Sequence, residues 1–205
     1  MITIIDYGVG NLRSVEKAFA AVGIKTEISN NPEVLQQAEA LVLPGVGAFG
    51  DAMISLKETG FDKLILDAAS NGKPILGICL GFQLLFEESE EFGLHKGLGL
   101  LPGRVIRFSD NDLRVPHVGW NQIHQSYPHP ILSDIANKAY FYFVHSFYVK
   151  TTLESDVIAS TNYGISFSAI AGRNNVVGAQ FHPEKSQHSG LTLLKNFATR
   201  MVKTC

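Results

Sequence analysis

The fold is decided by residues 74–81, Pro74-Ile75-Leu76-Gly77-Ile78-Cys79-Leu80-Gly81, where a short apolar run leads directly into a cysteine flanked by glycines. An apolar run of this length is typical of a buried strand, and residues 80–88, which follow, have a helical pattern. Glycines on both sides of the cysteine let the chain turn tightly without side-chain clashes. We therefore expect a strand that turns sharply into a helix, with Cys79 at the turn.

Before this turn the chain alternates between strand and helix patterns. The first expected helix is capped by Asn11, carries apolar residues at helical spacing and ends at Gly23. Strands are expected over residues 2–5, 24–28, 40–43 and 74–78, and further helices from Asn31-Pro32-Glu33, near 48–57 and over 61–70. Such alternation predicts a parallel sheet covered by helices on both faces.

The second half of the chain consists mainly of strand patterns separated by turn residues. Strands are expected over residues 104–108, 118–123, 140–149, 157–160, 167–171 and 176–181, and a closing helix over 190–202. No linker or repeat divides the chain, and 205 residues with 45% hydrophobic content suffice for one core. We expect a single α/β domain over residues 1–205, with a central, mostly parallel sheet flanked by helices and extended by antiparallel strands.

Charge and composition exclude several classes of partner. The formal net charge is -2 and no basic block occurs, so nucleic acid is not an expected partner. No apolar run approaches the ~18–20 residues that cross a bilayer, so no membrane contact is expected. The amino terminus lacks a basic leader and reads as a strand. The two cysteines, Cys79 and Cys205, indicate no disulfide framework, which favours a cytoplasmic location.

The cysteine turn has the features of an activated nucleophile. Its position at a helix amino terminus favours the thiolate, because the free N–H groups and the helix dipole stabilise negative charge. The N–H of Leu80 can stabilise the oxyanion of a tetrahedral intermediate. The alternative interpretation is a small buried cysteine at an ordinary strand end, which is common.

A candidate base lies about a hundred residues further on. The apolar run over residues 176–181 ends in His182-Pro183-Glu184. The residue before a proline is held extended, and in an extended chain positions two apart point to the same side. His182 and Glu184 are therefore expected to project together, with the carboxylate orienting the imidazole. Alone, such a pair is usually a surface pair, but with the cysteine it completes the nucleophile–base–acid set of acyl transfer.

Four ordered motifs carry a resemblance to a known family. They are Pro44-Gly45-Val46-Gly47, Gly77-Ile78-Cys79-Leu80-Gly81-Phe82-Gln83, His117-Val118-Gly119-Trp120-Asn121 and His182-Pro183-Glu184-Lys185-Ser186. Together they resemble the class I glutamine amidotransferases, and among these the glutaminase subunits of imidazole glycerol phosphate synthases. The similarity runs over nearly the whole chain.

The resemblance implies both a reaction and a set of site residues. Cys79 would attack the glutamine amide, release ammonia and form a thioester, and water activated by His182, which Glu184 orients, would free glutamate. The implied oxyanion residues are Val46, Gly47 and Leu80. The implied substrate-binding residues are Gly47, Gln83, Glu91 and Ser146. Phe147 departs from the tyrosine that the family more often has, so a hydroxyl contact is lost there.

The resemblance also implies a partner and no cofactor. Ammonia would pass to a separate cyclase or synthase subunit, in a heterodimer that serves histidine biosynthesis. The residues implied to face that subunit are Asn11, Trp120, Tyr142 and Lys185. No metal or organic cofactor is implied.

Several other signals are given weaker interpretations. Gly8-Val9-Gly10 follows a strand, but Arg13 stands where a dinucleotide fingerprint needs its third glycine. His117, His124, His129 and His145 have no metal-ligand spacing and are expected to be hydrogen-bonded or exposed. Residues 140–143 alternate between core and surface, and Tyr142 faces outward.

Two alternative functions remain open from the sequence. One is the glutaminase of another synthase, such as that of pyridoxal phosphate synthesis, where only the ammonia acceptor would differ. The other is a non-catalytic binding protein that kept the fold.

Overall fold

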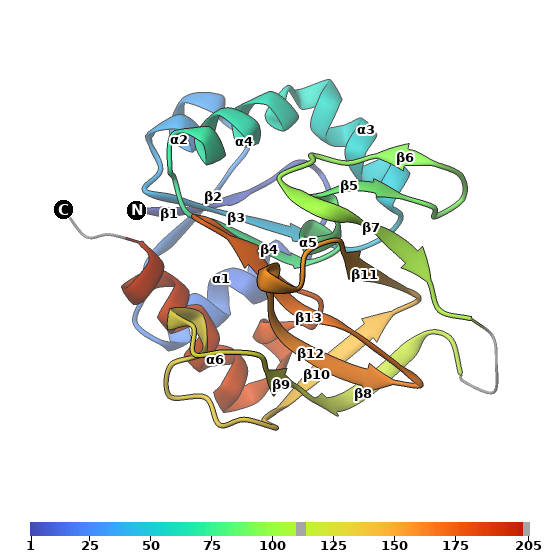
Figure 1. Cartoon of the computed structure of the whole chain (residues 1–205). Helices are drawn as coiled ribbons and strands as arrows, with labels where there is room; N and C mark the ends of the chain where they lie inside the picture. Colours follow the sequence, from blue (N-terminus) through green and yellow to red (C-terminus); the bar gives the residue numbers. More distant parts are fainter. Residues whose placement is uncertain (110–113, 203–205) are drawn as a thin grey trace.

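The computed structural model describes residues 1–109 and 114–202; Cys205, one of the two cysteines, lies outside this range. Its centre is an eight-stranded sheet (Figure 1). In spatial order the strands are β2 (Thr26–Ser29), β1 (Ile2–Ile5), β3 (Ala40–Gly45), β4 (Ile75–Cys79), β14 (Val176–Ala179), β13 (Ile165–Arg173), β12 (Val157–Tyr163) and β9 (His124–Gln125).

The pairing of the strands in the large sheet changes from parallel to antiparallel at β14. The strands from β2 to β14 pair in parallel, whereas β14–β13, β13–β12 and β12–β9 pair antiparallel. The registers align Gly45 with Cys79 and Ala179 with Ile78. The carboxyl ends of β3, β4 and β14 therefore meet at one edge, where open α/β sheets place their sites.

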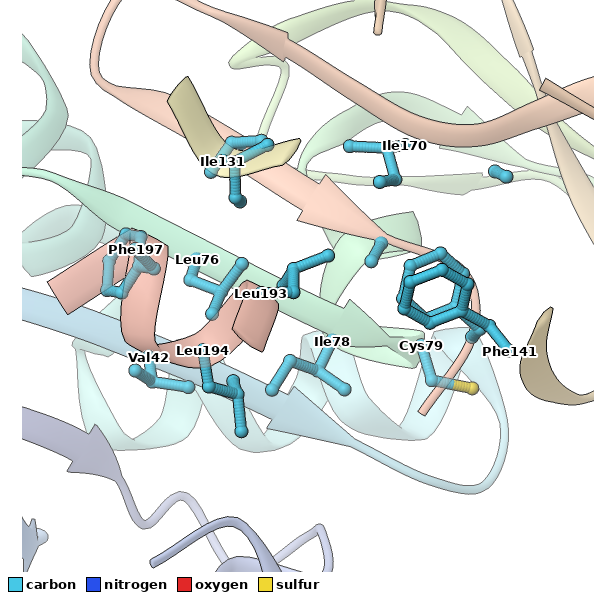
Figure 2. Close-up of a cluster of buried hydrophobic side chains, with 14 of the residues drawn as sticks. Val42, Leu76, Ile78, Cys79, Ile131, Phe141, Ile170, Leu193, Leu194 and Phe197 are labelled. Carbon is cyan, nitrogen blue, oxygen red and sulfur yellow. The ribbon is translucent and has the colours of Figure 1, made fainter. Parts of the chain in front are cut away.

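Helices cover both faces of this sheet. On one face lie α1 (Leu12–Ala21) and α6 (Gln187–Asn196), which continues as a π-helix over Phe197–Met201. On the other lie α2 (Pro32–Gln37), α3 (Phe49–Thr59) and α4 (Phe61–Ser70). Successive strand residues point to opposite faces, so Val42 packs in one core cluster and Leu43 in the other. Figure 2 shows part of the first cluster, to which both Cys79 and Phe141 belong.

Two smaller sheets flank the large one. A four-stranded sheet has the order β11 (Phe147–Thr151), β7 (Leu101–Arg107), β5 (Phe86–Ser89), β6 (His95–Lys96), and a two-stranded ribbon pairs β8 (His117–Gln122) with β10 (Tyr140–His145). Short 3-10 turns cover Pro130–Leu132, Glu154–Asp156 and Pro183–Lys185. The strand expected over residues 140–149 is thus two strands, which part at Ser146 and enter different sheets.

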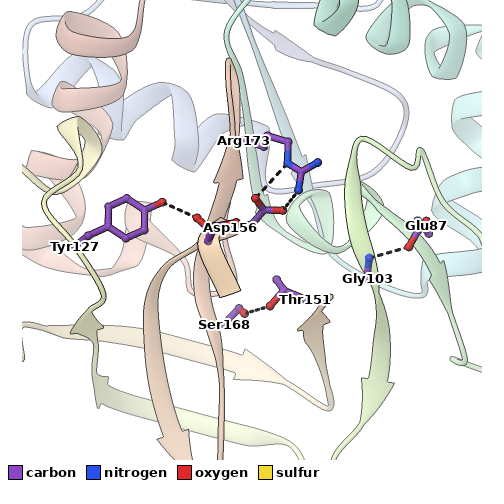
Figure 3. A network of polar contacts seen from close by, with 8 residues as sticks. Glu87, Gly103, Tyr127, Thr151, Asp156, Ser168 and Arg173 are labelled. Atoms are coloured by element: carbon purple, nitrogen blue, oxygen red, sulfur yellow. Dashed lines mark hydrogen bonds and ion pairs between the residues drawn. The ribbon is translucent and has the colours of Figure 1, made fainter. Parts of the chain in front are cut away.

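Polar contacts join these layers (Figure 3). The Thr151 and Ser168 hydroxyls lie 3.3 Å apart and connect β11 with β13. The Arg173 guanidinium donates two hydrogen bonds, of 3.1 and 2.8 Å, to the largely buried carboxylate of Asp156. A two-pronged contact of this kind fixes geometry as well as adding energy, so it holds the turn before β12 against β13.

Several expected elements need correction. The helix expected over residues 80–88 is wrong beyond α5 (Leu80–Leu84), because Phe86 and Ser89 pair with β7 and start the four-stranded sheet. Asn11 stands at the start of α1, but its side chain makes no capping hydrogen bond. The second strand begins only at Thr26, and the closing helix begins earlier than expected, at Gln187.

No helix in residues 1–109 and 114–202 is long and apolar enough to cross a membrane.

Candidate active site

Cys79 occupies a strained turn between β4 and α5. Its φ of 55° and ψ of -110° lie in a region that a residue with a Cβ rarely adopts. Such strain persists only where the surroundings enforce it, and it is concentrated at functional sites. The flanking glycines are needed for close packing: a Cβ on Gly77 would lie 2.8 Å from the Gly81 carbonyl oxygen, and a Cβ on Gly81 would overlap the Leu43 carbonyl. The turn is therefore a nucleophile elbow, as the sequence predicts.

Gly81→Ala tests this packing. We expect it to lower the free energy of unfolding by about 3 kcal/mol, at the upper end for overpacking, because the clashing atoms belong to backbone that cannot move aside. The matched control is Gly72→Ala, where φ is 77° and nothing lies within 4 Å of the added methyl. The control should cost only about 1–2 kcal/mol of left-handed backbone strain. Urea unfolding curves measure both, and equal losses would contradict the packing role of Gly81.

His182 and Glu184 lie against this turn and contact each other. The His182 Nδ1 is 2.7 Å from the Glu184 Oε1, and the two side chains are only 3% and 1% exposed. The Cys79 side chain lies within interaction range of this imidazole, because it is among the groups that raise the His182 pKa. His182 is extended as expected, but Pro183–Lys185 forms a 3-10 turn. His182 and Glu184 therefore meet because of this turn, and not because side chains alternate along an extended strand as the sequence predicts.

The surroundings of His182 favour its charged form. Burial alone would lower its pKa, but the hydrogen bonds and negative charges of Cys79 and Glu184 outweigh burial and raise the pKa to about 10. At neutral pH the imidazole therefore carries a proton. An imidazolium beside sulfur stabilises the anionic sulfur, which is the nucleophilic form.

A cavity of about 350 Å³ opens beside these three groups. Glu184 lies behind His182 and outside the cavity wall. The wall includes most of the site residues predicted from the sequence: Val46, Gly47, Cys79, Leu80, Gln83, Glu91, Ser146, His182 and Lys185. The structure therefore brings the predicted nucleophile, base, oxyanion and substrate residues to one place.

The predicted substrate-binding residues are held by contacts of their own. The Glu91 Oε2 accepts a 2.7 Å hydrogen bond from the Phe49 N–H at the start of α3. The Gln83 Nε2 donates to the Phe147 carbonyl at 3.0 Å and to the Gln180 Oε1 at 3.1 Å. Carboxylate and amide oxygens on these two side chains suit a cationic ligand group.

The predicted oxyanion segment packs directly on the elbow. A Cβ on Gly45 would lie 2.8 Å from the Gly81 N–H nitrogen, and Gly47 has a φ of 98° that disfavours other residues. The Tyr7 hydroxyl donates a 2.8 Å hydrogen bond to the Pro44 carbonyl. Burial, and then the negative charge of Cys79, raises the pKa of Tyr7, so the hydroxyl keeps its proton.

Three of the four predicted partner-facing residues cluster together. The rings of Trp120 and Tyr142 lie 6.1 Å apart, and the Lys185 Nζ is 6.0 Å from the centre of the Tyr142 ring. Asn11 lies elsewhere, before α1, and the neighbouring Gly10 packs against the Pro44 ring. The cluster lies on the β8–β10 ribbon beside the His-Pro-Glu turn.

Sequence reasoning missed Tyr7 and Gln180. The Gln180 side chain is fully buried, and its Nε2 lies 4.0 Å from the Cys79 sulfur. A polar residue in an otherwise apolar strand was the available signal for Gln180. Tyr7 gave no such signal, because a tyrosine after an apolar strand is ordinary.

Among the described residues, no group of three or more histidine, cysteine, aspartate or glutamate side chains has the arrangement of a metal site. The buried Glu184 Oε2 has no hydrogen-bond partner. Cys79, His182 and Glu184 supply a thiol, an imidazole and a carboxylate beside backbone donors, a combination that suits acyl transfer.

Comparisons with known proteins decide the family. The family model for class I glutamine amidotransferases matches residues 3–201. The chain belongs to this family. It is 53% identical over 197 residues to the imidazole glycerol phosphate synthase subunit HisH of Desulfitobacterium hafniense, covering 96% of this chain and 93% of that protein. The HisH subunit of Bacillus subtilis is 50% identical over 98% of this chain and 97% of its own length.

A solved structure supports the fold of this class I glutamine amidotransferase. The PurLQS structure from Thermotoga maritima superimposes with a TM-score of 0.78 at 20% identity, covering 96% of both chains. The fold, the family and the amidotransferase enzyme class predicted from the sequence are thereby confirmed.

Proposed function

We propose that this chain is the glutaminase subunit of an imidazole glycerol phosphate synthase. The observation that carries the reaction is the contact of Cys79, His182 and Glu184 beside one cavity. The assignment to this synthase is supported by the 53% and 50% identity to HisH subunits over nearly the full chain. The family model spans almost all residues, which supports one glutamine amidotransferase domain over residues 1–205. The bacterial biosynthetic relatives support a cytoplasmic location.

In the first half of the reaction, the Cys79 sulfur attacks the side-chain amide carbon of glutamine. The carbonyl oxygen becomes an oxyanion, which the N–H groups of Leu80 and of the Val46–Gly47 segment stabilise. His182, which is protonated at rest, donates its proton to the amide nitrogen as the carbon–nitrogen bond breaks. Ammonia leaves, and a glutamyl thioester remains on Cys79.

The second half needs His182 in its neutral form. Once the sulfur is a thioester, the hydrogen bond and negative charge of Cys79, two of the causes that raise the His182 pKa, are gone. The imidazole has also given up its proton, so it can accept one from water that attacks the thioester. Glu184 stays paired with Nδ1 and keeps Nε2 directed at the reacting groups.

A separate synthase subunit would receive the ammonia at the ribbon face. Trp120 is 46% exposed, and Val118 and Tyr140 on the same two strands are 56% and 55% exposed. Exposed aromatic residues such as these are enriched in the core of protein interfaces. Asn11, Tyr142 and Lys185 complete the proposed contact surface.

We expect glutamine hydrolysis to depend on this partner. Glutamate release by the chain alone should be slow, and should rise about 10- to 100-fold when the synthase subunit and its nucleotide ligand are added, as for a typical coupling between two sites. The physical reason is that the Pro44–Gly47 segment, which carries oxyanion donors, lies against the loop before α1. That loop ends at Asn11, a residue of the proposed contact surface, so docking of the partner acts on the position of the oxyanion donors. Equal, high rates with and without the partner would contradict the dependence.

Replacing Trp120 tests where the synthase subunit binds. Trp120→Ala should raise the Kd for the synthase subunit by about 30-fold, as expected for a central aromatic residue. Tyr127→Ala removes another partly exposed aromatic ring, which packs beside His129 instead, and should leave the Kd unchanged. Titration calorimetry measures both.

No observation favours the two alternative functions. The two relatives that are 53% and 50% identical over nearly the full chain are HisH subunits. A non-catalytic protein would have no need of a strained backbone at Cys79.

A further inference from the structure

Two buried histidines beside the cavity have no part in the proposed reaction. His117 and His145 are 3% and 7% exposed and lie directly opposite each other on β8 and β10. The His117 Nδ1 is 3.1 Å from the His145 Nε2. Burial lowers the pKa of His117 to about 4 and that of His145 to about 3, so both rings are neutral at neutral pH. Each ring therefore carries one proton.

The neighbours of His145 decide where its proton sits. The His145 Nδ1 lies 2.7 Å from the Phe147 carbonyl oxygen, which can only accept a hydrogen bond. The proton is therefore on Nδ1, and Nε2 is an acceptor. The facing His117 Nδ1 must then be the donor, which leaves the His117 Nε2 as an acceptor.

The contacts of Asn121, beside the His117 Nε2, require the same direction of hydrogen bonding. The Asn121 Oδ1 accepts from the Gln122 N–H at 2.8 Å, and its Nδ2 donates to the Asn162 carbonyl at 2.9 Å. These two contacts fix the amide orientation, so it is Nδ2 that lies 3.3 Å from the His117 Nε2. Hydrogen bonds therefore run one way, from Asn121 through His117 and His145 to the Phe147 carbonyl.

This series of hydrogen bonds ends on a residue of the cavity. The Phe147 carbonyl also accepts from the Gln83 Nε2, whose second proton goes to the Gln180 Oε1. Both amide protons of Gln83 are thus engaged. Its Oε1 has no hydrogen-bond partner among the described residues, and Gln83 lines the cavity. The oxygen is left as an acceptor for a donor group in the cavity.

We propose that the His117–His145 pair is a positioning device for the Phe147 carbonyl. That carbonyl holds the Gln83 Nε2, so that the Gln83 Oε1 accepts a hydrogen bond from the α-ammonium group of glutamine. The role rests on the proposed glutaminase function. Glu91, on the same cavity wall, adds a negative charge that suits the ammonium. A reversed Gln83 amide would present its N–H donors to the cavity, and these would repel the ammonium group.

A purely structural role for the pair is less consistent with its surroundings. Phe108, Phe143, Tyr163 and Phe167 surround the two rings. Burying ring nitrogens in such an apolar cluster costs free energy unless each is hydrogen-bonded, and two phenylalanines would fill the space without that cost. The polar pair gives direction to the hydrogen bonds, which apolar residues cannot do.

Nitrogen NMR of the histidine-labelled protein tests the assignment without measuring activity. At pH 7 we expect both His117 and His145 to be neutral and protonated at Nδ1. Protonation of either ring at Nε2 alone, or a charged ring, would overturn the proposal. Resonances are assigned with single-histidine variants.

A kinetic experiment with the complete synthase complex tests the role. His117→Phe keeps an aromatic ring in the stack and removes the donor to His145. We expect the KM for glutamine to rise about three- to tenfold, as for one lost hydrogen bond. The factor by which kcat falls should be smaller than the factor by which KM rises. Discrimination against 4-carbamoylbutanoate, which lacks the α-amino group, should shrink by the same factor.

Tyr163→Phe is the matched control. It removes a hydroxyl that donates to the Arg114 carbonyl, from a ring stacked on His117, and leaves the series of hydrogen bonds intact. Its KM should match that of the wild type. Equal KM increases in both variants, or unchanged discrimination in His117→Phe, would overturn the positioning role. A wild-type complex that releases no glutamate would contradict the proposed function instead, while the NMR result would still decide the proton positions.

Discussion

Cys79→Ala is expected to abolish glutamine-dependent synthesis, with a loss of at least ~10⁴-fold in kcat, because no other group in the cavity can form the thioester. Synthesis from added free ammonia by the same complex should stay at the wild-type level, since the proposed acceptor reaction takes place in the partner subunit. Alanine suits the test because it keeps a Cβ at the same strained backbone position and removes only the sulfur.

Cys205→Ser is the matched control for this change. It replaces the only other cysteine of the chain and should leave glutamine use unchanged. Coupled assays of glutamate release and of product formation, run with glutamine and then with an ammonium salt, separate the two activities. Residual glutamine use above one per cent in Cys79→Ala would show that another nucleophile acts.

His182→Gln is expected to give the second-largest loss, about 10²–10⁴-fold in kcat, the usual share of acid–base catalysis. Glutamine has a similar reach and remains polar, so the buried Glu184 keeps a hydrogen-bond donor. An alanine would leave that carboxylate buried and unpaired, which is strongly destabilising. The melting temperature of the variant, measured beside kcat, verifies that folding is retained.

Glu184→Gln separates the orienting carboxylate from the base. The loss in kcat should be clearly smaller than for His182→Gln, because a neutral amide can still hold the imidazole. Glu184 is one of the groups that raise the His182 pKa, so the pKa should fall in this variant. Since the imidazolium exists below that pKa, the alkaline limb of the kcat/KM profile should move to lower pH. A loss equal to that of Cys79→Ala, with an unmoved alkaline limb, would mean that Glu184 takes a direct part in the chemistry.

The parts of the fold that sequence predicts well are those with strong local signals. The strands Ile2–Ile5 and Ile75–Cys79 and the turn at Cys79 are predictable because short apolar runs and paired glycines leave few conformations open. Ala40–Gly45 is buried along its whole length, and its sequence is correspondingly apolar. The four motifs contain most of the predicted residues of the cavity, with Glu91 and Ser146 outside them.

The remaining features depend on contacts between distant residues. Nothing near Phe86 distinguishes a strand from a helix, and pairing with Leu101 decides it. Glu184 meets His182 through a turn that proline begins, and not through strand alternation. The roles suggested for His117 and His145 come from a cross-strand pairing that no spacing along the chain reveals.

The contact of sulfur and imidazole at the end of the parallel sheet is the basis of the proposed reaction, and covalent labelling tests it most directly. The complex is treated with a diazoketone analogue of glutamine, and the modified peptide is identified by mass spectrometry. We expect one label per chain on Cys79, protection by glutamine, and much slower labelling in His182→Gln. Inactivation with the label on any other residue, or labelling of Cys79 at the same rate in His182→Gln, would contradict the claim that His182 activates this cysteine.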